Sequence, residues 1–325
     1  MPLDPTTSAF LVQVAASGLK PVYEMTPEQA RLQYEAGSQP ADPQIEMLRV
    51  AEATLVVSGG EVLLRCLVPS AAPRAVIVYY HGGGWVIGSV NSFDATGRKL
   101  AKTSDCAVVL VDYRLAPEHP FPAAVDDAYA ALLWAETNLE AIAGRRVPLI
   151  VAGDSAGGNL AAVTAQRARD RDGPAIALQI LIYPATSCRT DTQSCMAPEN
   201  QLVLNRKALL WFLDLYLPDP ASRILPDAAP LLAEDLSRLP PAVVLTAEYD
   251  IIRDEGEAYA ARLIESGVPV IFRRYEGQIH GFLTRFMLPG SALAFDDIKR
   301  AIDNHLATSA ASGGGVGPNR SSLNA

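Results

Sequence analysis

The chain carries the stretch Gly153-Asp154-Ser155-Ala156-Gly157-Gly158 between two runs of different character. The apolar residues 147–152 before it are typical of a buried strand, and the Ala-rich residues 159–169 after it are typical of a helix. The sequence therefore places Ser155 on a sharp turn from strand to helix, which raises its hydroxyl above a sheet and strains its backbone. Gly153 and Gly157 flank the turn, where a Cβ would collide across it. We expect Ser155 to be a nucleophile that faces the N-terminal N–H groups of the helix.

The composition is that of an ordinary globular protein. The chain has 325 residues, 49% hydrophobic and 19% charged, with a formal net charge of −9. This length fits one large domain, or one domain with an insertion. Binding to nucleic acid would need a basic stripe, and the sequence has no run of Lys or Arg. No apolar run has the length of a membrane span and the first residues do not resemble a signal peptide, so we expect a cytoplasmic protein.

The four cysteines do not suggest a metal or redox site. They form no Cys-x-x-Cys pair, and Cys66 and Cys106 lie in apolar runs that are expected in the core. Cys188 and Cys195 are close together in a loop-like stretch, where a disulfide is an open alternative, although nothing indicates an oxidising compartment. We expect neither a metal nor a cofactor.

Runs typical of strands alternate with runs typical of helices along most of the chain. The expected strands are 56–68 (a hairpin that turns at Gly59-Gly60), 75–80, 106–112, 147–152, 176–183, 242–246 and 268–275, and the expected helices are 91–104, 122–138, 159–169, 254–266 and 292–308. This alternation predicts an α/β fold, with a mostly parallel sheet and helices on both faces.

Two segments depart from the alternation. Residues 1–45 hold two helical patterns without strands, the second with a capping box at Thr26, and residues 187–228 hold polar turns followed by an apolar helix. We expect them to form a cap over the site. In that cap, the apolar face of the first helix, with Phe10, Leu11 and Val14, would pack on the helix of the second segment. That helix carries Trp211, Phe212 and Leu215. A routine crossover helix is the alternative for residues 187–228.

The rest of the chain divides accordingly. We expect the catalytic domain over residues 46–186 and 229–308. Residues 309–325 are rich in Gly and Ser and are expected to form a disordered tail.

Acyl transfer at a serine needs a base, and the chain has only four histidines. His280 follows the strand 268–275, and α/β proteins build their sites in loops at the carboxyl ends of strands. His81 lies in a glycine-rich loop, His119 in a turn and His305 in the last helix. We therefore favour His280, with a purely structural histidine as the alternative.

An orienting acid is expected between the serine and the histidine in the chain. Asp250 follows the strand 242–246 and is favoured. Glu248 is a rival, as are Asp254 and Glu255, although both of these open a helix, where acids are common as caps and dipole partners.

Donors for an oxyanion are expected from the loop His81-Gly82-Gly83-Gly84-Trp85, which follows the strand 75–80. Glycines let the backbone approach a substrate and turn its N–H groups inward. The N–H groups of Gly83 and Gly84, with that of Ala156, would form a three-donor oxyanion hole, supported by His81, Gly82 and Asp154. An ordinary glycine loop is the alternative.

Taken together, these stretches resemble the hormone-sensitive-lipase-like family of α/β-hydrolases, in its bacterial esterase branch. The matching stretches are His81–Trp85, Asp112–Ala124, Gly153–Gly158, Asp250–Gly256 and His280–Phe282. The resemblance implies the α/β-hydrolase fold, a triad of Ser155, Asp250 and His280, and a helical cap. We interpret Asp112–Ala124 as structural support for the oxyanion loop.

The expected function is hydrolysis of carboxylic esters with short to medium acyl chains, through an acyl-enzyme. The partner would be a small-molecule ester, and a homodimer is an open alternative. A lactonase or an amidase could use the same triad. The family also includes binding proteins that lack the catalytic histidine, but His280 is present here.

Overall fold

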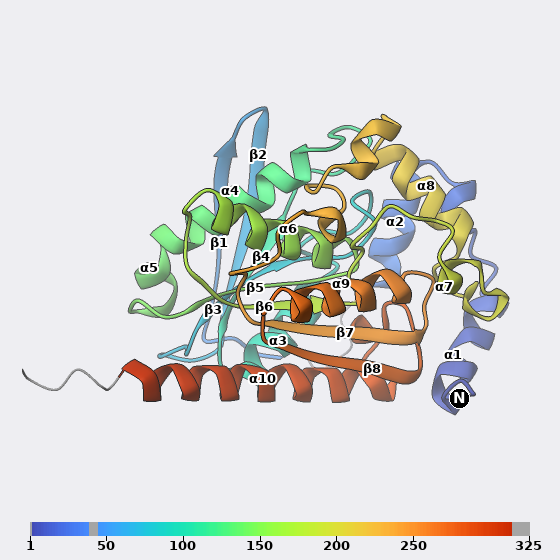
Figure 1. Cartoon of the computed structure of the whole chain (residues 1–325). Helices are drawn as coiled ribbons and strands as arrows, with labels where there is room; N and C mark the ends of the chain where they lie inside the picture. Colours follow the sequence, from blue (N-terminus) through green and yellow to red (C-terminus); the bar gives the residue numbers. More distant parts are fainter. Residues whose placement is uncertain (1, 39–44, 314–325) are drawn as a thin grey trace, which may run out of the picture.

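The computed structural model describes residues 2–38 and 45–313, with side chains up to residue 308 (Figure 1). These residues form an eight-stranded sheet in the order β1-β2-β4-β3-β5-β6-β7-β8. The strands are β1 (Arg49–Val57), β2 (Gly60–Val68), β3 (Val76–Tyr80), β4 (Ala107–Asp112), β5 (Leu149–Asp154), β6 (Ile176–Ile182), β7 (Ala242–Tyr249) and β8 (Val270–Ile279). Strand β2 pairs antiparallel with β1 and with β4. All other neighbouring strands in the sheet, from β4 and β3 across to β8, pair parallel. The predicted mostly parallel sheet and the hairpin are confirmed, but the turn is formed by Ser58 and Gly59, because Gly60 already pairs with Val57 as the first residue of β2.

Helices cover both faces of the sheet (Figure 1). One layer holds α4 (Ala123–Thr137), α5 (Leu139–Ala143), α6 (Ala156–Asp170) and α9 (Arg253–Glu265), and the other holds α3 (Asp94–Ser104) and α10 (Pro289–Gly313). Strand β3 shows why, because Val78 and Tyr80 pack into the first core while Ile77 and Tyr79 pack into the second. Successive side chains of a strand point to opposite faces, so a wholly apolar strand needs a helix layer on each side.

The other α-helices, together with the short 3-10 helix η1 that contacts α8, gather at one end of the sheet, at the right of Figure 1. They are α1 (Pro5–Ala16), η1 (Val22–Glu24), α2 (Pro27–Gly37), α7 (Gln193–Met196) and α8 (Arg206–Tyr216). The capping box of α2 is present, because Thr26 Oγ1 accepts from Gln29 N–H and Gln29 Oε1 accepts from Thr26 N–H, each at 3.2 Å. The sequence prediction of this helix start is confirmed.

The contacts of α1 differ from the expected ones. Phe10 and Leu11 pack against the core cluster formed with α3 and α10, and Val14 is 39% exposed. The contact with α8 comes instead from η1, where the Lys207 ammonium lies 5.6 Å from the Tyr23 ring centre. The reason is the anchor at the start of α1, where the N–H of residue 4 donates to the carbonyl of Gly277 (3.1 Å) and so draws the helix toward β8.

Several elements run further than their sequence patterns indicate. Strands β7 and β8 end at Tyr249 and Ile279, rather than at residues 246 and 275, so each ends directly before a candidate triad residue. Helix α10 continues to Gly313, beyond the expected end at 308. Residues 314–325 of the expected disordered tail lie outside the described residues.

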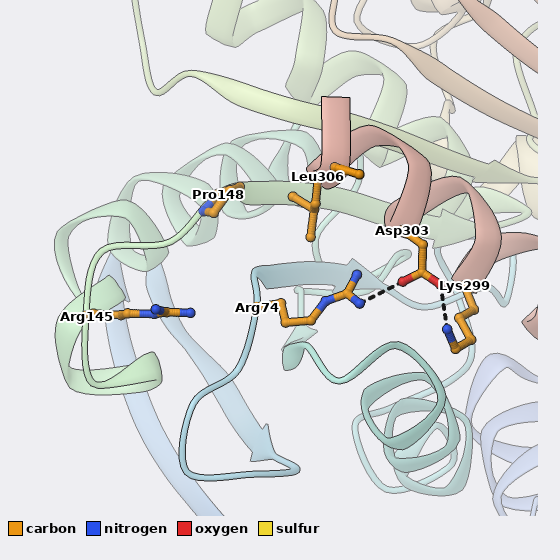
Figure 2. A pocket seen from close by; sticks show the side chains of 7 residues that line it. Arg74, Arg145, Pro148, Lys299, Asp303 and Leu306 are labelled. Carbon is orange, nitrogen blue, oxygen red and sulfur yellow. Dashed lines mark hydrogen bonds and ion pairs between the residues drawn. The ribbon is translucent and has the colours of Figure 1, made fainter. Parts of the chain in front are cut away.

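A cavity of about 720 Å³ lies at the amino ends of β3 and β5. Figure 2 shows its charged lining, in which Asp303 pairs with Arg74 at 2.7 Å and with Lys299 at 2.5 Å, while Arg145 points in from the other side. Ser155 follows the opposite, carboxyl end of β5. This cavity is therefore remote from the candidate nucleophile.

Candidate active site

The turn from β5 to α6 holds Ser155 as the sequence predicts. Its backbone has φ 56° and ψ −118°, a conformation that L-residues rarely adopt. The flanking glycines are needed because a Cβ at Gly153 would lie 2.2 Å from the carbonyl oxygen of Gly157, and one at Gly157 would lie 1.9 Å from that of Tyr80. Ser155 N–H donates to the carbonyl of Ile182 on the neighbouring strand β6 (2.9 Å), which fixes the turn to the sheet.

Three loops bring together the predicted triad. Ser155 Oγ lies 2.9 Å from His280 Nε2, and His280 Nδ1 lies 2.7 Å from Asp250 Oδ2. A carboxylate only accepts, so Nδ1 carries the proton and Nε2 presents its lone pair to the serine hydroxyl. Asp250 is 1% exposed, and its other oxygen accepts from Ile252 N–H at 3.0 Å, so its position is fixed.

The rival acids contact other groups. Glu248 Oε2 accepts from Gly277 N–H (2.7 Å), and Asp254 Oδ2 accepts from Ser194 N–H (2.6 Å). Glu255 accepts from Thr186 N–H (2.9 Å) and lies 2.6 Å from Ser187 Oγ. Burial raises the pKa of Glu255 to about 8. Asp250 is therefore the acid whose carboxylate meets His280.

The other histidines lie elsewhere. His119 lines a separate surface cavity of about 430 Å³, and His305 lies in α10. His81 is buried at the start of the glycine loop, where its ring stacks on Tyr113 (4.3 Å between centres) and its Nδ1 lies 2.7 Å from the carbonyl of Gly82. Burial lowers the pKa of His81, so its ring stays neutral and donates to that carbonyl.

The glycine loop after β3 is sharply turned. Gly83 and Gly84 have φ values of 120° and 59°, and the carbonyl of Gly83 accepts from Val86 N–H (3.1 Å) and Ile87 N–H (3.0 Å). Within the described residues, no hydrogen bond uses the N–H groups of Gly83, Gly84 or Ala156. These three N–H groups, two in the glycine loop and one in the residue after Ser155, therefore have no hydrogen-bond acceptor in the described part of the chain.

Asp154 ties the glycine loop to the nucleophile turn. Its Oδ1 accepts from Gly82 N–H (2.9 Å) and from the Tyr79 hydroxyl (2.8 Å). Burial raises the pKa of Asp154 to about 6, against these two hydrogen bonds, which lower it. The residue before Ser155 in the chain therefore fixes the position of Gly82, near the start of the glycine loop.

The stretch Asp112–Ala124 holds the glycine loop through hydrogen bonds to two of its carbonyls. Tyr113 Oη donates to the carbonyl of His81 (2.7 Å), and Ala116 N–H donates to that of Trp85 (2.9 Å). Asp112 Oδ1 accepts from Val90 N–H at 2.9 Å. These contacts agree with the supporting role expected for this stretch.

Sequence reasoning did not single out Tyr183, and it placed Phe212 in the cap without indicating its contact with the glycine loop. Tyr183 directly follows β6 and has φ 35°, and its ring centre lies 4.9 Å from that of His280. Phe212 of α8 packs directly on Gly84. Tyr183 has no local signal beyond its place at a strand end, whereas Phe212 lies on the apolar face expected in the cap.

No group of three or more metal-binding side chains occurs in the described ranges. In the same ranges, no helix has the length and apolar character needed to cross a bilayer. Cys188 and Cys195 are both free thiols, so the disulfide that the sequence left open is not formed.

A model of the α/β-hydrolase fold matches residues 77–284, which include the glycine loop and all three candidate triad residues. The chain belongs to the α/β-hydrolase family. This α/β-hydrolase is 41% identical to the carboxylic ester hydrolase LipN of Mycobacterium tuberculosis over 278 residues, 81% of this chain and 72% of LipN. It is 35% identical to the ethyl acetate hydrolase of Pseudomonas putida over 294 residues, 87% of this chain and 92% of that protein.

Among solved structures, this α/β-hydrolase is similar to the hyperthermophilic esterase of the archaeon Pyrobaculum calidifontis. The TM-score is 0.88 at 41% identity, over 94% of this chain and 99% of the other. These relatives confirm the resemblance to the esterase branch that the motifs indicated.

Proposed function

We propose that this α/β-hydrolase cleaves carboxylic esters with short to medium acyl chains, and that Ser155 is its nucleophile. The observation that carries the proposal is the hydrogen-bonded series from Ser155 Oγ through His280 (2.9 Å) to Asp250 (2.7 Å). The relatives' names, which include carboxylic ester hydrolase and ethyl acetate hydrolase, support the same class of substrate.

In the acylation step, His280 Nε2 takes the proton of Ser155 as Oγ attacks the ester carbonyl carbon. The carbonyl oxygen becomes an oxyanion, which the N–H groups of Gly83, Gly84 and Ala156 stabilise. The intermediate collapses with cleavage of the bond to the alkoxy oxygen, and His280 gives its proton to the leaving alcohol. Asp250 holds the ring in the required tautomer and stabilises the imidazolium.

Deacylation repeats these transfers with water. His280 Nε2 takes a proton from the water as its oxygen attacks the acyl carbon. The second tetrahedral intermediate then releases Ser155 Oγ, which recovers its proton from His280. The product is a carboxylic acid, and the enzyme returns to its starting state.

We also propose that residues 1–45 and 187–228 form the cap of a catalytic domain made by residues 46–186 and 229–308. The close packing of Phe212 on Gly84 supports this division, because it sets a side chain of the second segment against the proposed oxyanion loop. The cap would then limit the space for the acyl chain.

Active-site labelling combined with turnover tests this function. The wild type should hydrolyse aryl esters fastest from acetyl to hexanoyl, and a fluorophosphonate should label Ser155 alone, as located by peptide mass spectrometry. Ser155→Ala should abolish both signals. Lactones and anilides measured in parallel would reveal the alternative leaving groups. A label on another residue, or turnover that survives in Ser155→Ala, would refute the assignment.

A homodimer remains a prediction that the edge strand supports. Among the described strands, β8 pairs only with β7, and it exposes Ile271 and Phe272 by 49% and 42%. An open strand edge of this kind pairs readily with a second copy about a twofold axis. Sedimentation of the wild type and of Ile271→Lys would test it. The cytoplasmic location also stays a prediction.

A further inference from the structure

Arg31 of α2 links the N-terminal helices to the loop that bears the proposed oxyanion donors. Its Nε donates to the carbonyl of Val86 at 2.8 Å, and one terminal nitrogen donates to the carbonyl of Ala116, also at 2.8 Å. The same guanidinium grips both oxygens of Glu118, at 2.8 and 2.6 Å. A single side chain thus joins α2 to two loops of the catalytic domain.

These two loops are the ones that shape the glycine turn. The N–H of Val86 closes the turn on Gly83, and the N–H of Ala116 holds the carbonyl of Trp85. Val86 and Ala116 are both fully buried, so without Arg31 their carbonyls would lose a donor that water could not easily replace. The carbonyl of Val86 belongs to the same peptide as the N–H of Ile87, which donates to the carbonyl of Gly83 at 3.0 Å. Arg31 therefore holds one side of a peptide whose other side closes the glycine turn.

A second contact of α2 fixes the same segment. Glu35 Oε2 accepts from the Ser89 hydroxyl at 2.9 Å. Residues four apart lie on one face of a helix, so Arg31 and Glu35 present one face of α2 to the segment 86–89. This face of α2 therefore fixes the segment that follows the glycine loop, while Asp154 fixes the start of that loop through Gly82.

We propose that Arg31 is a positioning residue for ester hydrolysis, which aims the N–H groups of Gly83 and Gly84 by holding Val86 and Ala116. The inference rests on the proposed oxyanion hole. Arginine suits the task because its planar fork serves two carbonyls and a carboxylate at once, whereas the single ammonium of lysine cannot. The pKa of Glu118 falls to about 2, chiefly through its hydrogen bonds to Arg31, so this partner stays charged at any working pH.

The test compares Arg31→Met and Arg31→Lys with the wild type in the full chain. Active-site titration with a chromogenic phosphonate gives the fraction of folded enzyme, so that kcat is expressed per competent site. We expect kcat on an aryl acetate to fall about 10-fold to 100-fold in Arg31→Met, with KM changed less than about threefold, because the donors matter most in the transition state. Arg31→Lys should lose nearly as much.

A transition-state analogue separates positioning from a merely structural role. A trifluoromethyl ketone forms a tetrahedral oxyanion on the serine, so its affinity should fall by the same factor as kcat. The affinity for the corresponding methyl carbinol, which places no charge in the hole, should not change.

Two control variants complete the design. Arg169→Met removes a similar contact far from the site, where Arg169 donates to the carbonyls of Asp235 and Ser237, both at 2.9 Å. It should lower Tm without lowering kcat. Glu118→Gln keeps the two carbonyl contacts of Arg31 and should leave kcat within about threefold of the wild type.

The outcomes are distinct. An unchanged kcat per titrated site in Arg31→Met, or a loss confined to KM, would overturn the role of Arg31 and leave the proposed esterase intact. If Arg31→Met does not fold, Arg31→Lys, which keeps the charge but has a single donor nitrogen in place of the planar fork, decides between the same outcomes. A wild type without ester hydrolysis, or one whose turnover survives in Ser155→Ala, would overturn both proposals.

Discussion

Phe212 packs against Gly84 so closely that a Cβ built at position 84 would lie 2.3 Å from its ring. Phe212 is 7% exposed and belongs to α8, whereas Gly84 belongs to the loop that follows β3. A side chain of the proposed cap therefore forms a wall directly beside the proposed oxyanion hole. The size of that side chain should limit the acyl group.

Replacement of Phe212 should change the choice of acyl chain. Phe212→Ala removes a ring beside Gly84, so we expect relative kcat/KM for octanoyl and decanoyl esters to rise several-fold against acetyl esters. Kinetics across a series of aryl esters would measure this, with Leu225→Ala, an exposed position, as control. A chain-length profile that is the same in both variants would contradict the wall.

Ser155→Gly should remove turnover and also stabilise the fold. The backbone of Ser155 is strained at φ 56° and ψ −118°, and glycine tolerates positive φ without a Cβ clash. Such strain is of the order of 1–3 kcal/mol, so Tm should rise by about 2–6 °C in calorimetry. Ser155→Ala keeps the Cβ and serves as the matched control. Both variants should lose about 10⁴-fold or more in kcat.

Glu255 should make stability depend on pH. Its pKa is raised from 4.5 to about 8, so between these values the folded protein holds a proton that the unfolded chain has released. The contribution of Glu255 to the free energy of unfolding is therefore complete below the unfolded-state pKa of 4.5. It is lost as the pH rises toward the folded-state pKa of about 8. In Glu255→Gln the amide can accept from Thr186 N–H and donate to Ser187 Oγ, so the decline in Tm should flatten. Parallel Tm curves for both proteins from about pH 5 to pH 9 would count against this.

Displacement of α1 should lower catalysis as well as stability. Gly277 has φ 69°, and a Cβ there would lie 2.8 Å from the backbone nitrogen of Asp4, so Gly277→Ala should push the start of α1 away from the end of β8, which leads into His280. Gly267→Ala imposes similar strain at φ 80° but meets nothing within 4 Å. Both variants should lose Tm, and only Gly277→Ala should lose kcat, by several-fold. Equal kcat in the two would show that α1 has no such role.

The parts of the site that are predictable from sequence have their determinants close together in the chain. The turn at Ser155 needs an apolar run, small residues and a helix start, all of which are contiguous, and the capping box at Thr26 is equally local. Hydrophobic periodicity also locates the strands. It misjudges where β7 and β8 end, because pairing with a neighbouring strand extends them beyond their apolar runs.

What could not be predicted depends on contacts between distant residues. The acceptor Val86 lies 55 residues from Arg31, and nothing near Arg31 in the sequence indicates that its side chain turns toward the glycine loop. The partner of α1 was misjudged for the same reason. An amphipathic face shows that a helix must bury one side, but the anchor at Gly277 decides against what.

The position of β8 at the border of the sheet has a consequence for inactivation by heat. Of the described strands, β8 has β7 as its sole partner, and it leads directly into His280. Local unfolding of a border strand costs less free energy than unfolding of the central strands. His280, the proposed base, can therefore move away from Ser155 while β3, β5 and β6 are still paired. Activity should then disappear on warming before the global transition, and amide exchange in residues 270–279 should mark that loss.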